Sequence, residues 1–131
     1  MPMRFSILGS GSAGNSAFLQ TDNARVLVDA GFSAKRLDGL LAALGEKLAA
    51  IDAIFLTHEH SDHAAALTGL ARFPQIKVFA NRATAEALQR GLKHRIDWHL
   101  FETGATFRFR DLEVSSFSVP ATVLRALRNV P

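Results

Sequence analysis

The sequence has no cysteine among its 131 residues. This absence excludes a disulfide framework and a thiolate zinc finger, so any metal must be held by imidazole and carboxylate groups. No apolar run approaches the roughly 20 residues that span a bilayer. Gly9 and Gly11 also interrupt the N-terminal apolar run before the core of a signal peptide is complete. We therefore expect a soluble protein of the reducing cytoplasm, without a membrane partner.

Charge of either sign is sparse, with 15 basic and 12 acidic residues and a formal net charge of +3. The isoelectric point, close to 10.0, is compatible with attraction to nucleic acid but does not establish it. Hydrophobic residues make up 48% of the chain, which suffices for the core of one domain at this length.

The first third of the chain has the pattern of antiparallel strands followed by a helix. Strands are predicted at residues 4–8, 16–20 and 25–29, with turn residues at 21–23 between the last two. Ser33 can cap a helix whose leucines recur at helical spacing, and Gly45 suits its left-handed end.

Short apolar strands and helical patterns then alternate along the chain. A buried strand is predicted at 54–57, helices at 64–72 and 83–92, and strands at 77–80, 96–102, 105–110 and 112–119. A change of phase between Val114 and Phe117 suggests a bulge near Ser115 and Ser116. The fold class is α/β (α+β).

Four metal-ligand side chains follow the strand at 54–57, namely His58, His60, Asp62 and His63. Residues two apart in an extended segment project to the same side, so the first two can hold one ion. If the chain turns at Ser61, the other two can hold a second. Two such ions can clamp the attacking and leaving oxygens of a hydrolysed ester or phosphodiester. A polar surface cluster and a closed structural zinc site are the weaker alternatives.

His-x-His-x-Asp-His after a hydrophobic strand resembles the signature of the metallo-β-lactamase superfamily. The opening segment ILGSGSAGNS and the segment LTHEHSDH look most like its YycJ-type or WalJ-type branch. The resemblance implies an αββα sandwich and two divalent ions, usually zinc and sometimes manganese or iron. By position, His58 and His60 would bind the first ion and Asp62 and His63 the second. Asp29 would support the site from behind.

The resemblance fails after Pro120. In this branch a strand ending FSVP is followed by His-Asp, but Ala121 and Thr122 stand there. We therefore expect one domain over residues 1–131 that corresponds to the N-terminal half of the sandwich, incomplete at its C-terminus and atypical over 121–131. A frameshift or an early stop would explain this departure, and an uncovered sheet face would then favour self-association.

The glycine-rich segment after the first strand also matches a dinucleotide-binding fingerprint. That fingerprint requires a helix after its third glycine and then a parallel strand, and too few residues separate Gly14 from Val26 for such a crossover. Two interpretations remain for these glycines, namely a backbone turn close to a metal pocket and a plain connecting loop. The loop residues that could meet a substrate phosphate are Gly9, Ser10, Gly11, Ser12, Asn15 and Ser16.

The remaining polar residues give weaker signals. Strand alternation points Glu59 away from the motif, and His94 and His99 have the pattern of ordinary surface or edge residues. A polyanion-binding face is one interpretation of the basic residues Arg82, Arg90, Lys93, Arg95, Arg108 and Arg110. The alternative is a solvated helix face on which Glu86 forms ion pairs with Arg82 and Arg90.

These observations favour a metal-dependent hydrolase of a phosphodiester, in DNA or RNA, with Asp62 holding an ion and orienting the attacking water. Hydrolysis of a thioester or a lactam uses the same ligands. A third hypothesis is a metal-binding chain without catalytic activity.

Overall fold

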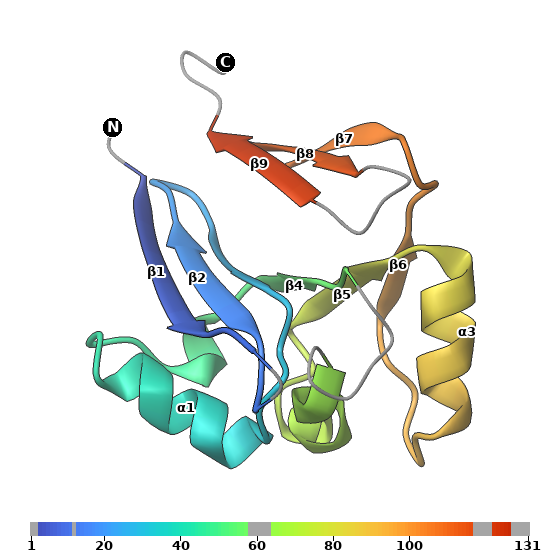
Figure 1. Cartoon of the computed structure of the whole chain (residues 1–131), viewed down its shortest axis with the longest axis horizontal. Coiled ribbons are helices and arrows are strands. Elements are labelled where there is room, and N and C mark those ends of the chain that lie inside the picture. Colours follow the sequence, from blue (N-terminus) through green and yellow to red (C-terminus); the bar gives the residue numbers. More distant parts are fainter. Residues whose placement is uncertain (1–2, 12, 58–63, 117–121, 127–131) are drawn as a thin grey trace.

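The computed structural model describes residues 3–11, 13–57, 64–116 and 122–126, which form three layers (Figure 1). The larger sheet contains β1 (Arg4–Gly9), β2 (Ser16–Gln20), β3 (Arg25–Val28), β4 (Ala53–Phe55), β5 (Lys77–Ala80) and β6 (Trp98–Leu100). The smaller sheet contains β7 (Thr106–Phe109), β8 (Leu112–Ser116) and β9 (Thr122–Ala126). The helical segments are α1 (Ala34–Ala42), the 3-10 helices η1 (Leu48–Ala50) and η2 (Ala65–Arg72), and α3 (Arg82–Arg90).

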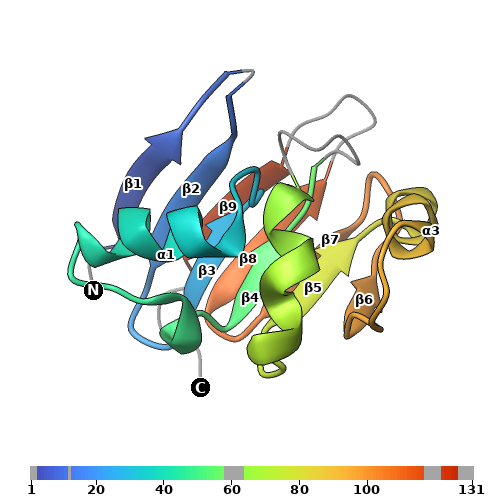
Figure 2. The ribbon, with the colours of Figure 1, turned by 90° about the horizontal axis from the view of Figure 1, so that it is seen from below.

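Strand order in the larger sheet follows chain order, β1-β2-β3-β4-β5-β6. The first three strands are antiparallel neighbours, whereas β3, β4, β5 and β6 are parallel. Crossovers between parallel strands have one preferred hand, so connections that all step in the same direction place their helices on the same face. Figure 2 shows this arrangement from below, with α1 and η2 in front of the sheet.

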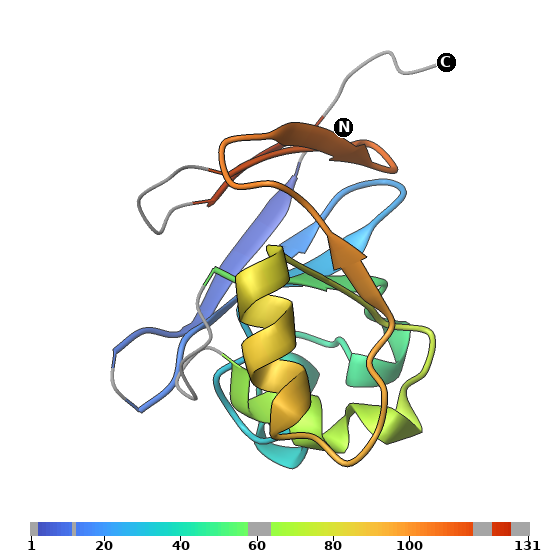
Figure 3. The same cartoon turned by 90° about the vertical axis from the view of Figure 1, so that its right-hand side faces the viewer.

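The two faces of the larger sheet alternate residue by residue. We call the side under α1, η2 and α3 the helix face, and the side under β7–β9 the inter-sheet face (Figure 3). Side chains on the helix face come from Phe18, Leu27, Ile54 and Val78, which join one core cluster. Side chains on the inter-sheet face come from Leu19, Val26, Ala53, Phe55 and Phe79, which join another.

Local signals fix the helices on the helix face. The backbone N–H of Arg36 donates to the hydroxyl of Ser33 at 3.2 Å, so the predicted cap of α1 is confirmed. Gly45 has a φ of +77°, as predicted for the turn after this helix. The helix predicted at 64–72 forms as the 3-10 helix η2, and α3 begins at the Asn81 cap, whose side chain accepts from the Thr84 N–H at 2.8 Å.

The smaller sheet packs its aromatic side chains on the inter-sheet face. The Phe55 ring lies 4.9 Å from that of Phe79 and 5.9 Å from that of Phe109, measured between ring centroids. Phe109 is buried whereas Arg108 and Arg110 are exposed, which confirms one apolar and one solvated face. A polar contact also joins the sheets, because the Thr21 hydroxyl donates to the buried carboxylate of Asp111 at 2.5 Å.

The bulge predicted near Ser115 and Ser116 is wrong. Ser115 pairs with Thr106 on one side and with Val123 on the other, and the register continues to Ser116 without a shift. Regular partners on both sides leave no position for an extra residue. The only register shift among the described strand pairs lies in β1–β2, between Ile7 and Gly9. The strand β9 was not predicted.

The inter-sheet face is exposed over β1. Phe5 pairs with Leu19 and Ile7 with Ala17, so both side chains lie on this face. Phe5 is 55% exposed and Ile7 60% exposed, and the preceding Met3 is also exposed. The smaller sheet therefore covers the middle of the inter-sheet face and leaves apolar side chains on β1 in water.

Within the part of the chain that the structure describes, no helix has the length and apolarity to cross a bilayer.

Candidate metal centre

Several chain segments meet at one edge of the larger sheet, which we call the site edge. The parallel strands β3, β4, β5 and β6 all end there, and β2 begins there because it runs antiparallel to β3. The residues that follow β4 lead into the motif at 58–63. Polar groups placed after neighbouring strand ends can therefore be brought together in space.

Asp29 lies at this edge directly after β3. Its side chain is buried and its φ is +61°, in the left-handed region that non-glycine residues rarely adopt. This conformation ends the strand at Val28, one residue earlier than predicted. Its backbone N–H still donates to the Phe55 carbonyl at 2.8 Å, so the residue remains attached to β4. Strained positions of this kind often occur at functional sites.

The Asp29 carboxylate holds the residue that precedes the motif. It accepts from the Thr57 backbone N–H at 2.8 Å and from the Thr57 hydroxyl at 2.6 Å. Hydrogen bonds to an ionised acceptor are roughly twice as strong as neutral ones. Asp29 thereby fixes the direction in which the chain leaves β4. Sequence reasoning missed Thr57, for which the only signal was its position immediately before His58.

The predicted ligands His58, His60, Asp62 and His63 lie outside the described residues, as does Glu59. Their role as a metal site therefore stays a prediction. No group of three or more metal-ligating side chains occurs in the described ranges. The donor set of the motif, three imidazoles and one carboxylate, fits zinc, manganese or iron, which accept nitrogen and oxygen ligands.

The glycine-rich loop between β1 and β2 reaches the same edge. The Asn15 side chain closes it, accepting from the Gly11 N–H at 3.0 Å and donating to the Gly11 carbonyl at 2.8 Å. Gly11 has a φ of +120°, a backbone conformation that residues with a side chain rarely adopt. A Cβ on Gly14 would lie 2.5 Å from the Phe32 ring, so this glycine allows a close approach.

The ends of this loop bind to the segment around Asp29. The buried Ser16 hydroxyl donates to the Asp29 carbonyl at 2.8 Å, and the Gly31 N–H donates to the Asn15 carbonyl at 2.9 Å. Gly9 and Ser10 lie at the start of the loop, and Ser10 is exposed. Ser12 lies outside the described residues. The loop and the exit of β4 are thus both anchored to the turn that follows β3.

The two remaining histidines lie away from Asp29. His99 stacks on the Phe79 ring with centroids 5.0 Å apart, and its Nε2 lies 3.3 Å from a carboxylate oxygen of Asp97. The His94 carbonyl accepts a hydrogen bond from the Gln89 side chain at 2.7 Å. His99 fits the expectation of an edge residue because it lies on β6, the last strand of the larger sheet, whereas His94 is half-buried and its Nε2 is buried.

The layered fold, the histidine-rich motif after β4 and the buried Asp29 define a class of proteins. A family model described as the metallo-beta-lactamase superfamily matches residues 9–125. The chain belongs to the metallo-β-lactamase superfamily. The match extends into β9, beyond Pro120, where sequence analysis expected the resemblance to end.

Within this class the chain is related to two curated exodeoxyribonucleases. It is 42% identical over 120 residues to the exodeoxyribonuclease WalJ of Streptococcus pneumoniae, covering 88% of this chain and 45% of the relative. It is 38% identical over 121 residues to the exodeoxyribonuclease YycJ of Bacillus anthracis, covering 91% and 46%. The chain spans about half the length of the curated relatives it matches.

Solved structures agree on the fold. The subclass B3 metallo-β-lactamase MEM-A1, from a soil metagenome library, matches 97% of this chain and 56% of its own with a TM-score of 0.75 at 20% identity. A diphosphatase of the PhnP family matches 86% and 55% with a TM-score of 0.71 at 18% identity. The predicted class, α/β with half of an αββα sandwich, is confirmed.

Proposed function

We propose that this chain provides the metal-binding half of a metal-dependent phosphodiesterase that acts on DNA. The observation that supports this most is the buried Asp29 carboxylate, which holds Thr57 and so orients the segment that enters the motif. The relatives named above are exodeoxyribonucleases, which favours DNA over a lactam or a thioester. The cysteine-free composition favours the cytoplasm as its compartment.

In this proposal each motif residue has one task. His58 and His60 hold one divalent ion, and Asp62 and His63 hold the other. When bound, two such ions supply water of lowered pKa and a clamp for the phosphoryl oxygens. Asp62 also orients the attacking water. Asp29 acts through Thr57 as a positioning residue, and the loop from Gly9 to Ser16 provides backbone N–H groups near a substrate phosphate.

Replacing His58 and His60 together by alanine tests the metal site. We expect loss of most bound metal, because half of the four proposed protein ligands disappear. Metal content would be measured by atomic emission after dialysis against zinc or manganese. The double variant His94→Ala/His99→Ala removes the same number of imidazoles elsewhere and should retain the metal. Equal metal content in both variants would show that the motif is not the site.

The reaction itself is tested by comparing substrates. Bis-p-nitrophenyl phosphate and end-labelled DNA should be hydrolysed in preference to S-lactoylglutathione, and a His60→Ala variant should abolish the difference. Preference for the thioester would assign the same ligands to the alternative reaction.

A second candidate is a metal-binding chain that lacks turnover by itself. The exposed apolar side chains Phe5 and Ile7 on the inter-sheet face favour it, since they mark a surface that association would bury. This candidate predicts weak metal binding, an apparent size above that of a monomer in size-exclusion chromatography, and hydrolysis no faster than His60→Ala. A monomer with two tightly bound ions and turnover lost in that variant would exclude it.

A further inference from the structure

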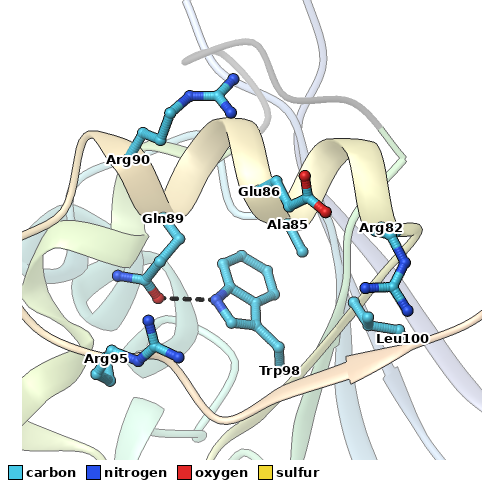
Figure 4. Close-up of a pocket in the computed structure, with 8 residues that line it drawn as sticks. All are labelled: Arg82, Ala85, Glu86, Gln89, Arg90, Arg95, Trp98 and Leu100. Carbon is cyan, nitrogen blue, oxygen red and sulfur yellow. Dashed lines mark hydrogen bonds between the residues drawn. The ribbon is translucent and has the colours of Figure 1, made fainter.

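A pocket of about 480 Å³ lies between α3 and β6, away from Asp29. Its lining combines a tryptophan with three arginines and one glutamate (Figure 4). Trp98 lies under the helix on the helix face of the sheet, because its backbone pairs with Val78. Figure 4 shows Arg82 beside Leu100 at one end and Arg90 and Arg95 towards the other.

The Trp98 indole is held in place before any ligand arrives. Its N–H donates to the Gln89 side-chain oxygen at 2.8 Å, and the same oxygen accepts from the Ile96 N–H at 3.1 Å. The Gln89 amide nitrogen donates to the His94 carbonyl at 2.7 Å. Gln89 therefore ties α3 to the segment leading into β6. A half-buried ring fixed in this way offers a stacking surface at little cost in conformational entropy.

The arginines around the ring are not neutralised by the ion pairs that sequence spacing suggested. Within the described residues, Glu86 forms no ion pair with Arg82 or with Arg90. The guanidinium of Arg110, by contrast, lies 2.9 Å from the Asp52 carboxylate and belongs to another part of the surface. The pocket keeps an excess of positive charge from exposed side chains.

The pocket also extends from the site edge along α3, as a path for a substrate strand would. Arg82 follows β5 at the site edge, and Arg90 lies eight residues further along α3, about 12 Å away along the helix axis. That span exceeds one nucleotide. Aromatic surfaces flanked by cations are the features that bind single strands without sequence preference, since every base has a face to stack and every nucleotide a phosphate.

We propose that this pocket binds a segment of single-stranded DNA, with a base stacked on Trp98 and phosphates held by Arg82, Arg90 and Arg95. The proposal rests on the proposed function in its choice of DNA. In this proposal the pocket between α3 and β6 binds the DNA strand, and the end of that strand is cleaved at the site edge. An acidic peptide would match the charge but would make no use of the fixed ring.

Trp98 is the only tryptophan and the sequence has no tyrosine, so intrinsic fluorescence reports on this pocket alone. The chain would be titrated with short oligothymidylate in EDTA, which removes any dependence on hydrolysis. We expect saturable quenching that weakens with salt. Polyglutamate and an abasic oligonucleotide of equal length should not quench. Quenching by polyglutamate equal to that by oligothymidylate would overturn the proposal.

Variants would be compared by the anisotropy of a labelled oligonucleotide. Arg82→Ala/Arg95→Ala should lower the slope of log affinity against log salt by about 1.4, at roughly 0.7 for each lost phosphate contact. The control Lys35→Ala/Arg72→Ala removes two exposed cations outside the pocket and should leave the slope unchanged. Equal slopes in the two double variants would show that Arg82 and Arg95 do not bind phosphates of the strand, which would overturn the proposal.

The ring is tested by Trp98→Leu, which should weaken binding roughly five- to hundredfold, and by Trp98→Phe, which should restore most of it. Circular dichroism of both variants would establish that the fold is retained. Binding that is unchanged in Trp98→Leu overturns the proposal. Strand binding without turnover would contradict only the proposed reaction, whereas turnover without strand binding at the pocket would contradict only this inference.

Discussion

The two faces of the larger sheet differ in how completely they are covered. On the helix face, aliphatic side chains from α1, η1 and η2 fill a cluster in which Leu37, Leu41 and Leu48 are fully buried. On the inter-sheet face, a smaller cluster of stacked phenylalanines contacts β7 and β8 and stops short of β1. The helix face is closely packed under α1, η1 and η2, whereas the inter-sheet face over β1 is exposed.

This difference separates stability from assembly. Truncating a buried side chain on the helix face should destabilise the fold, because α1, η1 and η2 cover the core on that side. Changing the exposed part of the inter-sheet face should alter what the chain associates with and leave its fold intact. The substitutions below test this separation in order of decreasing effect on the free energy of unfolding.

Leu37→Ala should have the largest effect. Leu37 is fully buried in the helix-face cluster, and truncation of a buried leucine costs about 2–5 kcal/mol through lost transfer energy and the cavity left behind. Urea denaturation followed by circular dichroism measures it. The control is Leu100→Ala on the exposed edge strand, where the change should stay within about 0.5 kcal/mol. Similar losses in both would mean that the helix face is loosely packed.

Gly14→Ala should have the second largest effect on the free energy of unfolding. The new Cβ would lie 2.5 Å from the Phe32 ring, which belongs to the helix-face cluster, so overpacking should cost about 1–3 kcal/mol in addition to the strain of a positive φ. Gly11→Ala is the matched control, since its φ is also positive but no atom lies within 4 Å of its Cβ. The melting temperature of Gly14→Ala should be clearly lower than that of Gly11→Ala. The reverse order would argue against tight packing of the opening loop on Phe32.

Thr21→Val tests the polar link between the sheets. It removes the donor to Asp111 and leaves a buried carboxylate without that partner, which should cost about 1–3 kcal/mol. Thr106→Val, which changes an exposed threonine of the smaller sheet, should have little effect. Chemical denaturation of both variants measures the contrast. A negligible loss in Thr21→Val would show that the hydrogen bond between Thr21 and Asp111 contributes little to the packing of the two sheets.

Phe5→Lys/Ile7→Lys should change stability by less than about 0.5 kcal/mol, because both side chains are exposed on an edge strand. It should nevertheless shift the chain towards monomer, since charges on the apolar face oppose burial. Sedimentation velocity would measure the shift. Ala42→Lys/Ala83→Lys adds the same charge at exposed positions of α1 and α3 and should leave association unchanged. Loss of association in both would assign the effect to net charge.

Local signals in the sequence predicted most of the elements. Ser33 and Gly45 mark the two ends of α1 because a side-chain oxygen and a positive φ are required there. The alternation around Phe109 likewise predicted which side of β7 is buried. The spacing of His58, His60, Asp62 and His63 pointed to the superfamily to which the chain belongs.

Features that depend on distant residues could not be predicted. The contact between Asp29 and Thr57 joins residues 28 positions apart, and it exists because β3 and β4 are parallel neighbours. The regular register at Ser115 depends on β9, whose pairing no local pattern indicates. Charges four apart on α3 suggested ion pairs with Glu86, whereas the ring of Trp98, from another strand, makes the same surface a pocket.

The sequential strand order of the larger sheet also bears on how the molecule is made. Each new strand pairs with the one synthesised immediately before it, so no strand has to be inserted between two that are already paired. The antiparallel pairs β1–β2 and β2–β3 are joined by short loops and can form quickly, whereas the parallel pairs from β3 to β6 require longer crossovers that contain helical segments. A chain that emerges from the ribosome N-terminus first could therefore extend its sheet strand by strand, so that each unpaired edge is exposed only until the next strand arrives.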